Sequence, residues 1–177
     1  YYLGDCALRN QNYDAALGYF AVVAGKPRSA FTEQALLGAG AASFALKRYD
    51  DAFKFYEQLE NQAELKQNLL EARAGMLRSA FMGGQFEQVV SAADKLIATE
   101  KVSDELVREA HFDKAKALFS LGKLDLAFDQ FATVAQSVKN VEGAESKYHM
   151  VEILFQQKKY DQAEQEVFSF AEKNTPH

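Results

Sequence analysis

The stretch Phe44–Ala52, FALKRYDDA, decides the fold because related stretches recur along the chain. The others are LRNQNYDAA from Leu8, FMGGQFEQV from Phe81, FSLGKLDLA from Phe119 and FQQKKYDQA from Phe155. Each begins with a large apolar residue, passes through a polar or Gly-containing turn, and continues with Tyr, Phe or Leu, an acidic residue and then a small residue. The five starting positions are 36, 37, 38 and 36 residues apart. A period in this range indicates an array of helical repeats.

Each repeat is expected to be a hairpin of two helices joined at the recurring turn. After the first turn, Ala16, Phe20 and Val23 lie at i, i+4 and i+7, which places them on one face of a helix. The second helices are predicted to run over 13–24, 49–60, 86–99, 124–139 and 160–173, with 174–177 ending the last one. The first helices are predicted within 1–10, 29–46, 65–81, 103–121 and 144–157. Candidate N-caps are Ser29 or Thr32 in the second repeat and Ser103 in the fourth, and 140–143 is expected to be a link.

The resulting fold class is all-α: a right-handed α-solenoid of about five helix-turn-helix repeats. One repeat domain is expected over 1–177, with units near 1–28, 29–64, 65–102, 103–140 and 141–177. The repeat register places Tyr1 inside a helix, and natural solenoids have polar caps at their ends. We therefore expect the sequence to be a piece of a longer array.

Composition limits the classes of partner. The net charge of −5 and the pI near 5.3 give no broad attraction for phosphate backbones or anionic lipid, so no nucleic-acid or membrane-inserting role is expected. Cys6 is the single cysteine, which excludes an intramolecular disulfide and a thiolate metal cluster. Its expected role is that of a small buried apolar residue. No run of about 18 apolar residues is present.

Catalytic and cofactor signatures are missing from the positions where they would be recognised. His111 and His149 lack the paired-His spacing of a zinc helix. The segment 38–40 (Gly-Ala-Gly) lies inside a predicted helix, whereas a dinucleotide loop follows a strand, so close helix packing is the better interpretation. The carboxylate pairs at 50–51 and 142/145 fall at helix starts, where they favour the helix dipole. We predict no catalytic residue, no cofactor, no metal and no enzymatic activity.

The repeats resemble the tetratricopeptide repeat family, which has units of about 34 residues, each made of two antiparallel helices. The resemblance covers essentially the whole chain. The matching residues are Leu3, Gly4, Tyr13, Ala16 and Phe20 in the first unit; Gly40, Tyr49, Ala52 and Tyr56 in the second; and Ala115, Gly122, Leu124, Ala127 and Phe131 in the fourth. The chain also looks similar to large bacterial proteins of the cell envelope that contain this repeat, which favours a periplasm-facing location, with the cytoplasm as the alternative.

The resemblance implies that one face of each first helix lines a concave groove that binds a polypeptide. The candidate groove residues are Asp5, Leu37, Phe44, Arg78, Phe81, Phe112, Lys116, Phe119, Tyr148, Glu152 and Phe155. The resemblance also implies that Ala41 lies on this face. Stacking would align Leu8 with the four phenylalanines of the recurring turn in one apolar column. This column either packs between neighbouring helices, as apolar stripes usually do, or forms the floor of the groove.

The expected function is therefore a non-catalytic scaffold that binds a protein or peptide of unknown identity. Two alternatives stay open: structural spacer repeats within a larger protein, and an RNA-binding helical repeat, which the acidic balance opposes. Self-association through the open ends of the array is a further expectation for the partner.

Overall fold

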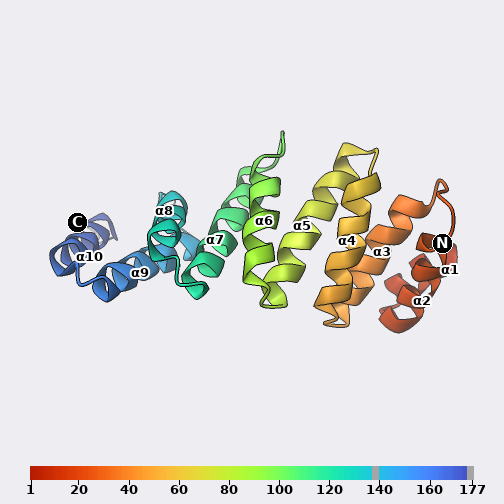
Figure 1. Ribbon diagram of the computed structural model, residues 1–177, viewed down its shortest axis with the longest axis horizontal. Helices are drawn as coiled ribbons and strands as arrows, with labels where there is room; N and C mark the ends of the chain where they lie inside the picture. The colour runs from red at the N-terminus through yellow and green to blue at the C-terminus, as the bar shows by residue number, and fades with distance from the viewer. Residues whose placement is uncertain (137–139, 175–177) are drawn as a thin grey trace. The chain divides into compact units, whose positions relative to one another are not determined.

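The computed structural model describes residues 1–136 and 140–174, and helices account for most of these residues. No strand occurs within these two ranges (Figure 1). The helices are α1 (Tyr2–Arg9), α2 (Tyr13–Ala24), α3 (Thr32–Ala45), α4 (Tyr49–Gln62), α5 (Lys66–Met82), α6 (Phe86–Ile97), α7 (Asp104–Ser120), α8 (Leu124–Ala135), α9 (Val141–Gln156) and α10 (Tyr160–Asn174). Successive pairs form helical hairpins, which confirms the predicted all-α repeat fold.

The recurring turn has one backbone geometry in all five hairpins. Three positions after its first residue the backbone has a positive φ, from 58° at Gln11 to 72° at Gly122, and Lys47, Gly84 and Lys158 share this conformation. The next N–H closes the turn: Arg48 N donates to Ser43 O at 2.9 Å, and the other four hairpins repeat this bond. This is the Schellman termination of a helix. It explains why every second helix begins at the position that the sequence predicted.

Side-chain caps fix several helix starts. Ser103 accepts a hydrogen bond from Leu106 N at 3.3 Å, as predicted. The predicted link at 140–143 is wrong: Asn140 caps α9 by accepting from Gly143 N at 2.7 Å, so the helix begins at Val141. Neither Ser29 nor Thr32 is the N-cap of α3, since Thr32 already lies in the helix and its hydroxyl accepts from Ser29 N at 2.8 Å.

Two helix ends were predicted at the margins of the described residues. The sequence placed the end of the eighth helix near Lys139, which lies outside the described residues, and α8 ends at Ala135. The predicted stop at 174–177 falls mostly outside them as well; α10 reaches Asn174.

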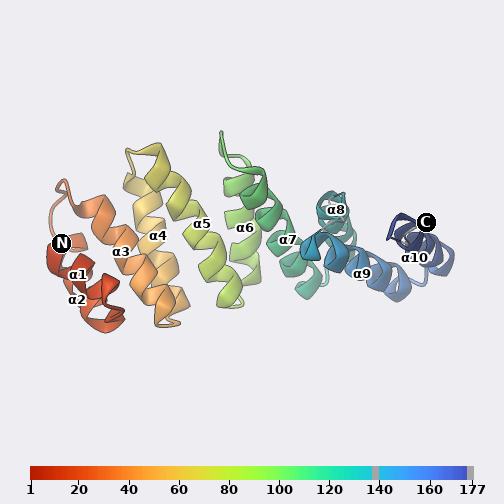
Figure 2. The same cartoon turned by 180° about the vertical axis from the view of Figure 1, so that it is seen from behind.

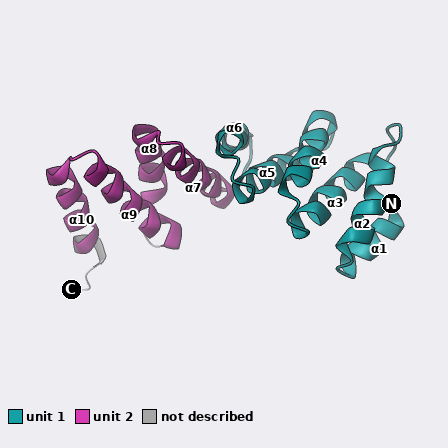
Figure 3. Cartoon of the chain, turned by 60° about the horizontal axis from the view of Figure 1, so that its bottom comes forward, with its two compact units in different colours: residues 1–102 teal, residues 103–177 magenta. Residues whose placement is uncertain are grey.

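The chain divides into two compact units, Tyr1–Val102 and Ser103–His177 (Figure 3). The division coincides with the boundary expected between the third and fourth repeats. Within the first unit each helix packs on the next from α1 to α5, α5 packs on α6, and the first helices also touch each other as α1·α3 and α3·α5. Within the second unit α7 packs on α8, α8 on α9, and α9 on α10. Each unit therefore has its own core between neighbouring hairpins.

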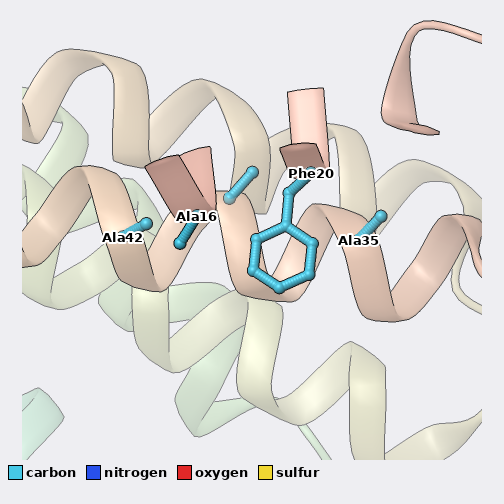
Figure 4. Packing of buried hydrophobic residues seen from close by; sticks show 5 residues of the cluster. Ala16, Phe20, Ala35 and Ala42 are labelled. Atoms are coloured by element: carbon cyan, nitrogen blue, oxygen red, sulfur yellow. The ribbon is translucent and has the colours of Figure 1, made fainter. Parts of the chain in front are cut away.

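Glycines allow aromatic rings to pack directly on helix backbones in the first unit. The ring of Phe20, 1 % exposed, lies against α3 among Ala16, Ala35 and Ala42 (Figure 4). A Cβ at Gly38 would lie 2.5 Å from this ring, and one at Gly4 of α1 would lie 2.7 Å from it. The expectation that 38–40 serves close helix packing is confirmed.

Two further sequence expectations have a clear outcome. Cys6 is exposed on α1, so the prediction that it is buried is wrong. Its position lies on the solvent side of a short helix that has only Gly4 fully buried. Among the described residues, no helix combines the length and the apolar character needed to cross a bilayer.

Candidate functional site

An open pocket of about 220 Å³ lies in the first unit between the first helices of the second and third hairpins. Helices α3 and α5 contact each other here, and α4 packs against both (Figure 1, Figure 2). The pocket is lined by Leu37, Ala41, Phe44, Tyr56, Glu71, Gly75 and Arg78. Four of these residues, Leu37, Ala41, Phe44 and Arg78, were expected from the sequence on the groove face. The structure thus brings predicted residues from two different repeats into one pocket.

Tyr56 of α4 reaches the pocket because two glycines hold its ring. A Cβ at Gly40 would lie 2.7 Å from the ring and one at Gly75 would lie 2.6 Å from it, so the ring is fixed between α3 and α5. Tyr56 is 8 % exposed. Burial and, after it, the charge of Glu71 raise the pKa of Tyr56 to about 12, while Arg78 opposes the shift. The phenol therefore stays protonated at neutral pH and retains its O–H donor.

The walls of the pocket differ in chemistry. On α3, Leu37, Ala41 and Phe44 form an apolar wall, and the Phe44 ring is braced edge-on by Tyr49 with centroids 5.3 Å apart. On α5, Glu71 and Arg78 lie seven residues apart and therefore on one helix face. Both are exposed, and Glu71 also accepts a hydrogen bond from Gln67 Nε2 at 2.9 Å. The arrangement offers an apolar contact flanked by one negative and one positive charge.

The remaining predicted residues of the first unit lie outside this pocket. Phe81 lies on α5 three residues after Arg78 and is half-buried. Asp5 pairs with Arg9 at 3.0 Å within α1. Neither lines the pocket.

In the second unit the predicted residues belong to a packed network or to the surface. Phe112 is buried against Phe131, with ring centroids 6.3 Å apart, and Lys116 Nζ lies 5.1 Å above its ring. Phe119 is half-buried and packs on His149. On the surface, Tyr148 is 67 % exposed and Phe155 is 63 % exposed. Glu152 lies 3.1 Å from His149 Nδ1. The phenylalanine column is thus neither wholly core nor wholly groove.

Sequence reasoning missed three residues of the pocket as site residues: Tyr56, Glu71 and Gly75. The sequence identified Tyr56 only as a residue that matches the tetratricopeptide pattern, whereas in the structure it lines the pocket. Gly75 carried a usable signal, because glycine inside a helix costs roughly 1 kcal/mol relative to alanine and calls for a packing or functional reason. Glu71 had no signal that separates it from other exposed carboxylates.

Buried charges elsewhere in the first unit have a structural role. The Glu60 carboxylate, on a side chain 9 % exposed, accepts from Arg73 Nε at 3.0 Å and from Lys95 Nζ at 2.6 Å. Burial alone would raise the pKa of Glu60, but the hydrogen bonds from Lys95 and Arg73 outweigh it and leave the pKa lowered. These contacts join α4, α5 and α6, which holds the third hairpin against the second.

Stacked helical hairpins with a small mixed pocket between their first helices define a helical-repeat scaffold. Residues 1–31, which contain α1 and α2, match a model of the tetratricopeptide repeat family. The first hairpin matches this repeat family, and the chain has the fold of a tetratricopeptide-repeat protein. Proteins of this class are generally non-catalytic scaffolds that bind other proteins.

Solved structures support the fold at low sequence identity. A crystal structure of MamA shares 15 % identity over 97 % of this chain and 94 % of that chain, with a TM-score of 0.73. Another MamA crystal structure shares 16 % identity over 97 % of this chain and 87 % of that chain, with a TM-score of 0.75. A Podospora anserina putative kinesin light chain with nearly identical TPR-like repeats shares 14 % identity over 94 % and 90 % of the two chains, with a TM-score of 0.66. No curated protein sequence matches significantly.

Proposed function

We propose that the chain binds a polypeptide segment along the face of its first helices, and that the pocket above Tyr56 receives one side chain of that segment. The observation that carries the proposal is the convergence of Leu37, Phe44 and Arg78, from two successive repeats, on one open pocket. The surrounding repeat scaffold supports a role in protein interaction.

The size of the pocket favours a peptide side chain over a small-molecule ligand. Its volume of about 220 Å³ is below the roughly 300–1,000 Å³ that is usual for small-molecule and cofactor sites. The apolar wall on α3 and the Tyr56 ring would bury an aliphatic or aromatic side chain. Glu71 and Arg78 would contact the flanking residues and set the direction of the segment, because charge complementarity contributes mainly to specificity.

A peptide selection with a blocked variant tests the proposal. Random peptides displayed on phage are selected on immobilised wild-type chain and on Ala41→Lys, which places a long charged side chain in the pocket. Ala45→Lys is the matched control, since Ala45 lies four residues later on α3, is exposed and does not line the pocket.

The proposal requires that wild type and Ala45→Lys enrich the same peptides, with one recurring apolar position, and that Ala41→Lys does not retain them. Arg78→Glu should shift the charge preferred next to the apolar position from acidic to basic. Retention of the selected peptides by a folded Ala41→Lys variant would contradict the assignment. Failure of the wild type to enrich any peptide would favour the structural-spacer alternative.

A further inference from the structure

The second unit contains the same groove positions as the first unit, but different residues occupy them. Counting from the first residue of the recurring turn equates Leu37, Ala41, Phe44, Tyr56, Glu71, Gly75 and Arg78 with Phe112, Lys116, Phe119, Phe131, Glu145, His149 and Glu152, in that order. In four of the seven pairs, both residues are apolar or aromatic, or both are acidic. The changes from Ala41 to Lys116 and from Gly75 to His149 replace the two smallest side chains of the pocket with long or ring-bearing ones.

In the first unit these two small residues line the open pocket. Gly75 has no side chain, and the α5 backbone approaches the Tyr56 ring closely enough that a Cβ would lie 2.6 Å from it. Ala41 presents only a methyl group between Leu37 and Phe44. The two helices cover most of the Tyr56 ring, which is 8 % exposed, so a partner side chain would enter the pocket beside Ala41 and Gly75 and meet only the exposed part of the ring.

In the second unit His149 occupies the corresponding space. Its ring stacks on Phe131, with centroids 4.8 Å apart and planes 20° apart, and its centroid lies 5.4 Å from that of Phe119. Its Nδ1 lies 3.1 Å from the Glu152 carboxylate and its Nε2 lies 3.7 Å from Glu145. The His149 side chain is only 18 % exposed. The imidazole thus covers the aromatic floor that a partner side chain would need.

Lys116 closes the other side of the same groove. Its Nζ lies 3.1 Å from Glu145 and 5.1 Å above the Phe112 ring, so the side chain bridges from α7 to α9. A salt bridge between α7 and α9 at this position has no counterpart at Ala41, which cannot form one. The corresponding groove is therefore occupied by the chain's own side chains.

We propose that the residues at these two positions determine which groove accepts a partner: Gly75 and Ala41 open the first-unit groove to one apolar side chain, whereas His149 and Lys116 keep the second-unit groove closed. The inference rests on the proposed function, since it specifies where along the chain a peptide is anchored. It also names the chemistry of a second, latent site. Removing both side chains exposes Phe131 as a floor flanked by Glu145 and Glu152, which would favour an apolar side chain next to Lys or Arg.

The test opens the second groove while the first is blocked. Peptides are selected on three full-length variants: Ala41→Lys, Ala41→Lys/Lys116→Ala/His149→Ala, and the control Ala41→Lys/Lys147→Ala. Lys147 lies on α9 and pairs with Glu166 of α10, so its removal also breaks an ion pair of α9 but lies outside the groove positions. His149→Ala is chosen because alanine keeps the helix propensity that glycine would lose.

We expect no enrichment on Ala41→Lys or on the control, and enrichment of apolar peptides with an adjacent Lys or Arg on the opened variant. By isothermal titration, the opened variant with Ala41 restored should bind two peptides per chain, one from each selection. If the opened variant folds but enriches no peptide, the inference is overturned. The proposed function still stands in that case, provided that the wild type binds its peptides. If circular dichroism shows that the triple variant has lost its helices, the selection is repeated on Ala41→Lys/His149→Ala. Enrichment on this variant supports the inference, and no enrichment on it, when folded, overturns the inference.

A wild type that shows no Ala41-dependent peptide binding would remove the proposed function and this inference with it. That outcome is read from the wild-type chain alone. The two failures are therefore distinguishable.

Discussion

Replacing Gly38 with alanine should destabilise the first unit, although alanine is the better helix former. In an exposed helix interior the same change gains roughly 1 kcal/mol. At Gly38 the added Cβ would lie 2.5 Å from the Phe20 ring. The ring cannot move away, because Gly4 holds its opposite side, where a Cβ would lie 2.7 Å from it. Overpacking of this kind costs roughly 1–3 kcal/mol.

Gly18→Ala is the matched control. Gly18 lies inside α2, is exposed, and would have no heavy atom within 4 Å of its new Cβ. It should therefore gain the propensity term without the clash. We expect Gly38→Ala to be about 1–2 kcal/mol less stable than wild type and Gly18→Ala to be about 0.5–1 kcal/mol more stable.

Urea unfolding followed by circular dichroism measures the two changes in free energy, and amide hydrogen exchange in α3 reports the local effect. The double variant Gly38→Ala/Phe20→Leu provides a second check, because a smaller side chain should relieve the clash and give a coupling energy of about 0.5 kcal/mol or more. Equal stabilisation by Gly38→Ala and Gly18→Ala would refute the packing argument.

Three further outcomes follow from local geometry. Lys47→Gly should stabilise the second hairpin by about 1 kcal/mol, because Lys47 has a φ of 59°, which favours glycine; an unchanged urea midpoint would contradict this. Ser103→Ala should destabilise the second unit by about 1 kcal/mol in the same assay through loss of the α7 cap. The lowered pKa of Glu60 stabilises the fold above the unfolded-state pKa near 4.5, and this contribution is lost as pH falls through the folded-state pKa. Stability curves between pH 7 and pH 3 should therefore fall less steeply for Glu60→Gln than for wild type, and parallel curves would exclude the mechanism.

The fold could be predicted closely because its information is local and repeated. A helix termination with positive φ, followed by a helix with an acidic first turn, leaves a signature of about nine residues, and five copies reinforce one another. The error at 140–143 arose where the signal was not repeated. Asn140 is a good N-cap residue, but Gly143 made the segment look like a link, and its N–H is in fact the cap's donor.

The site could be predicted only in part, although predicted residues lie on both the α3 and the α5 side of the pocket. Counting along each first helix identified Leu37, Phe44 and Arg78, which share helix faces. Whether a face is open depends on residues that approach from a neighbouring helix, and periodicity within one helix carries no information about them. Phe44 and Phe119 occupy equivalent positions, yet Phe44 lines a pocket whereas Phe119 packs on His149.

Gly75 therefore links packing to binding in a way that neither property alone would show. As a packing residue it lets α5 approach the Tyr56 ring, and the same absence of a side chain leaves the pocket that Gly75 lines open. At the equivalent position of the second unit, His149 packs on its aromatic floor through the imidazole and covers it. One position thus sets both the distance between neighbouring hairpins and the access to the groove between them. In the proposed function, repeats that share a fold therefore differ in binding, because a single substitution at this position would exchange a contact with a partner for a contact within the chain.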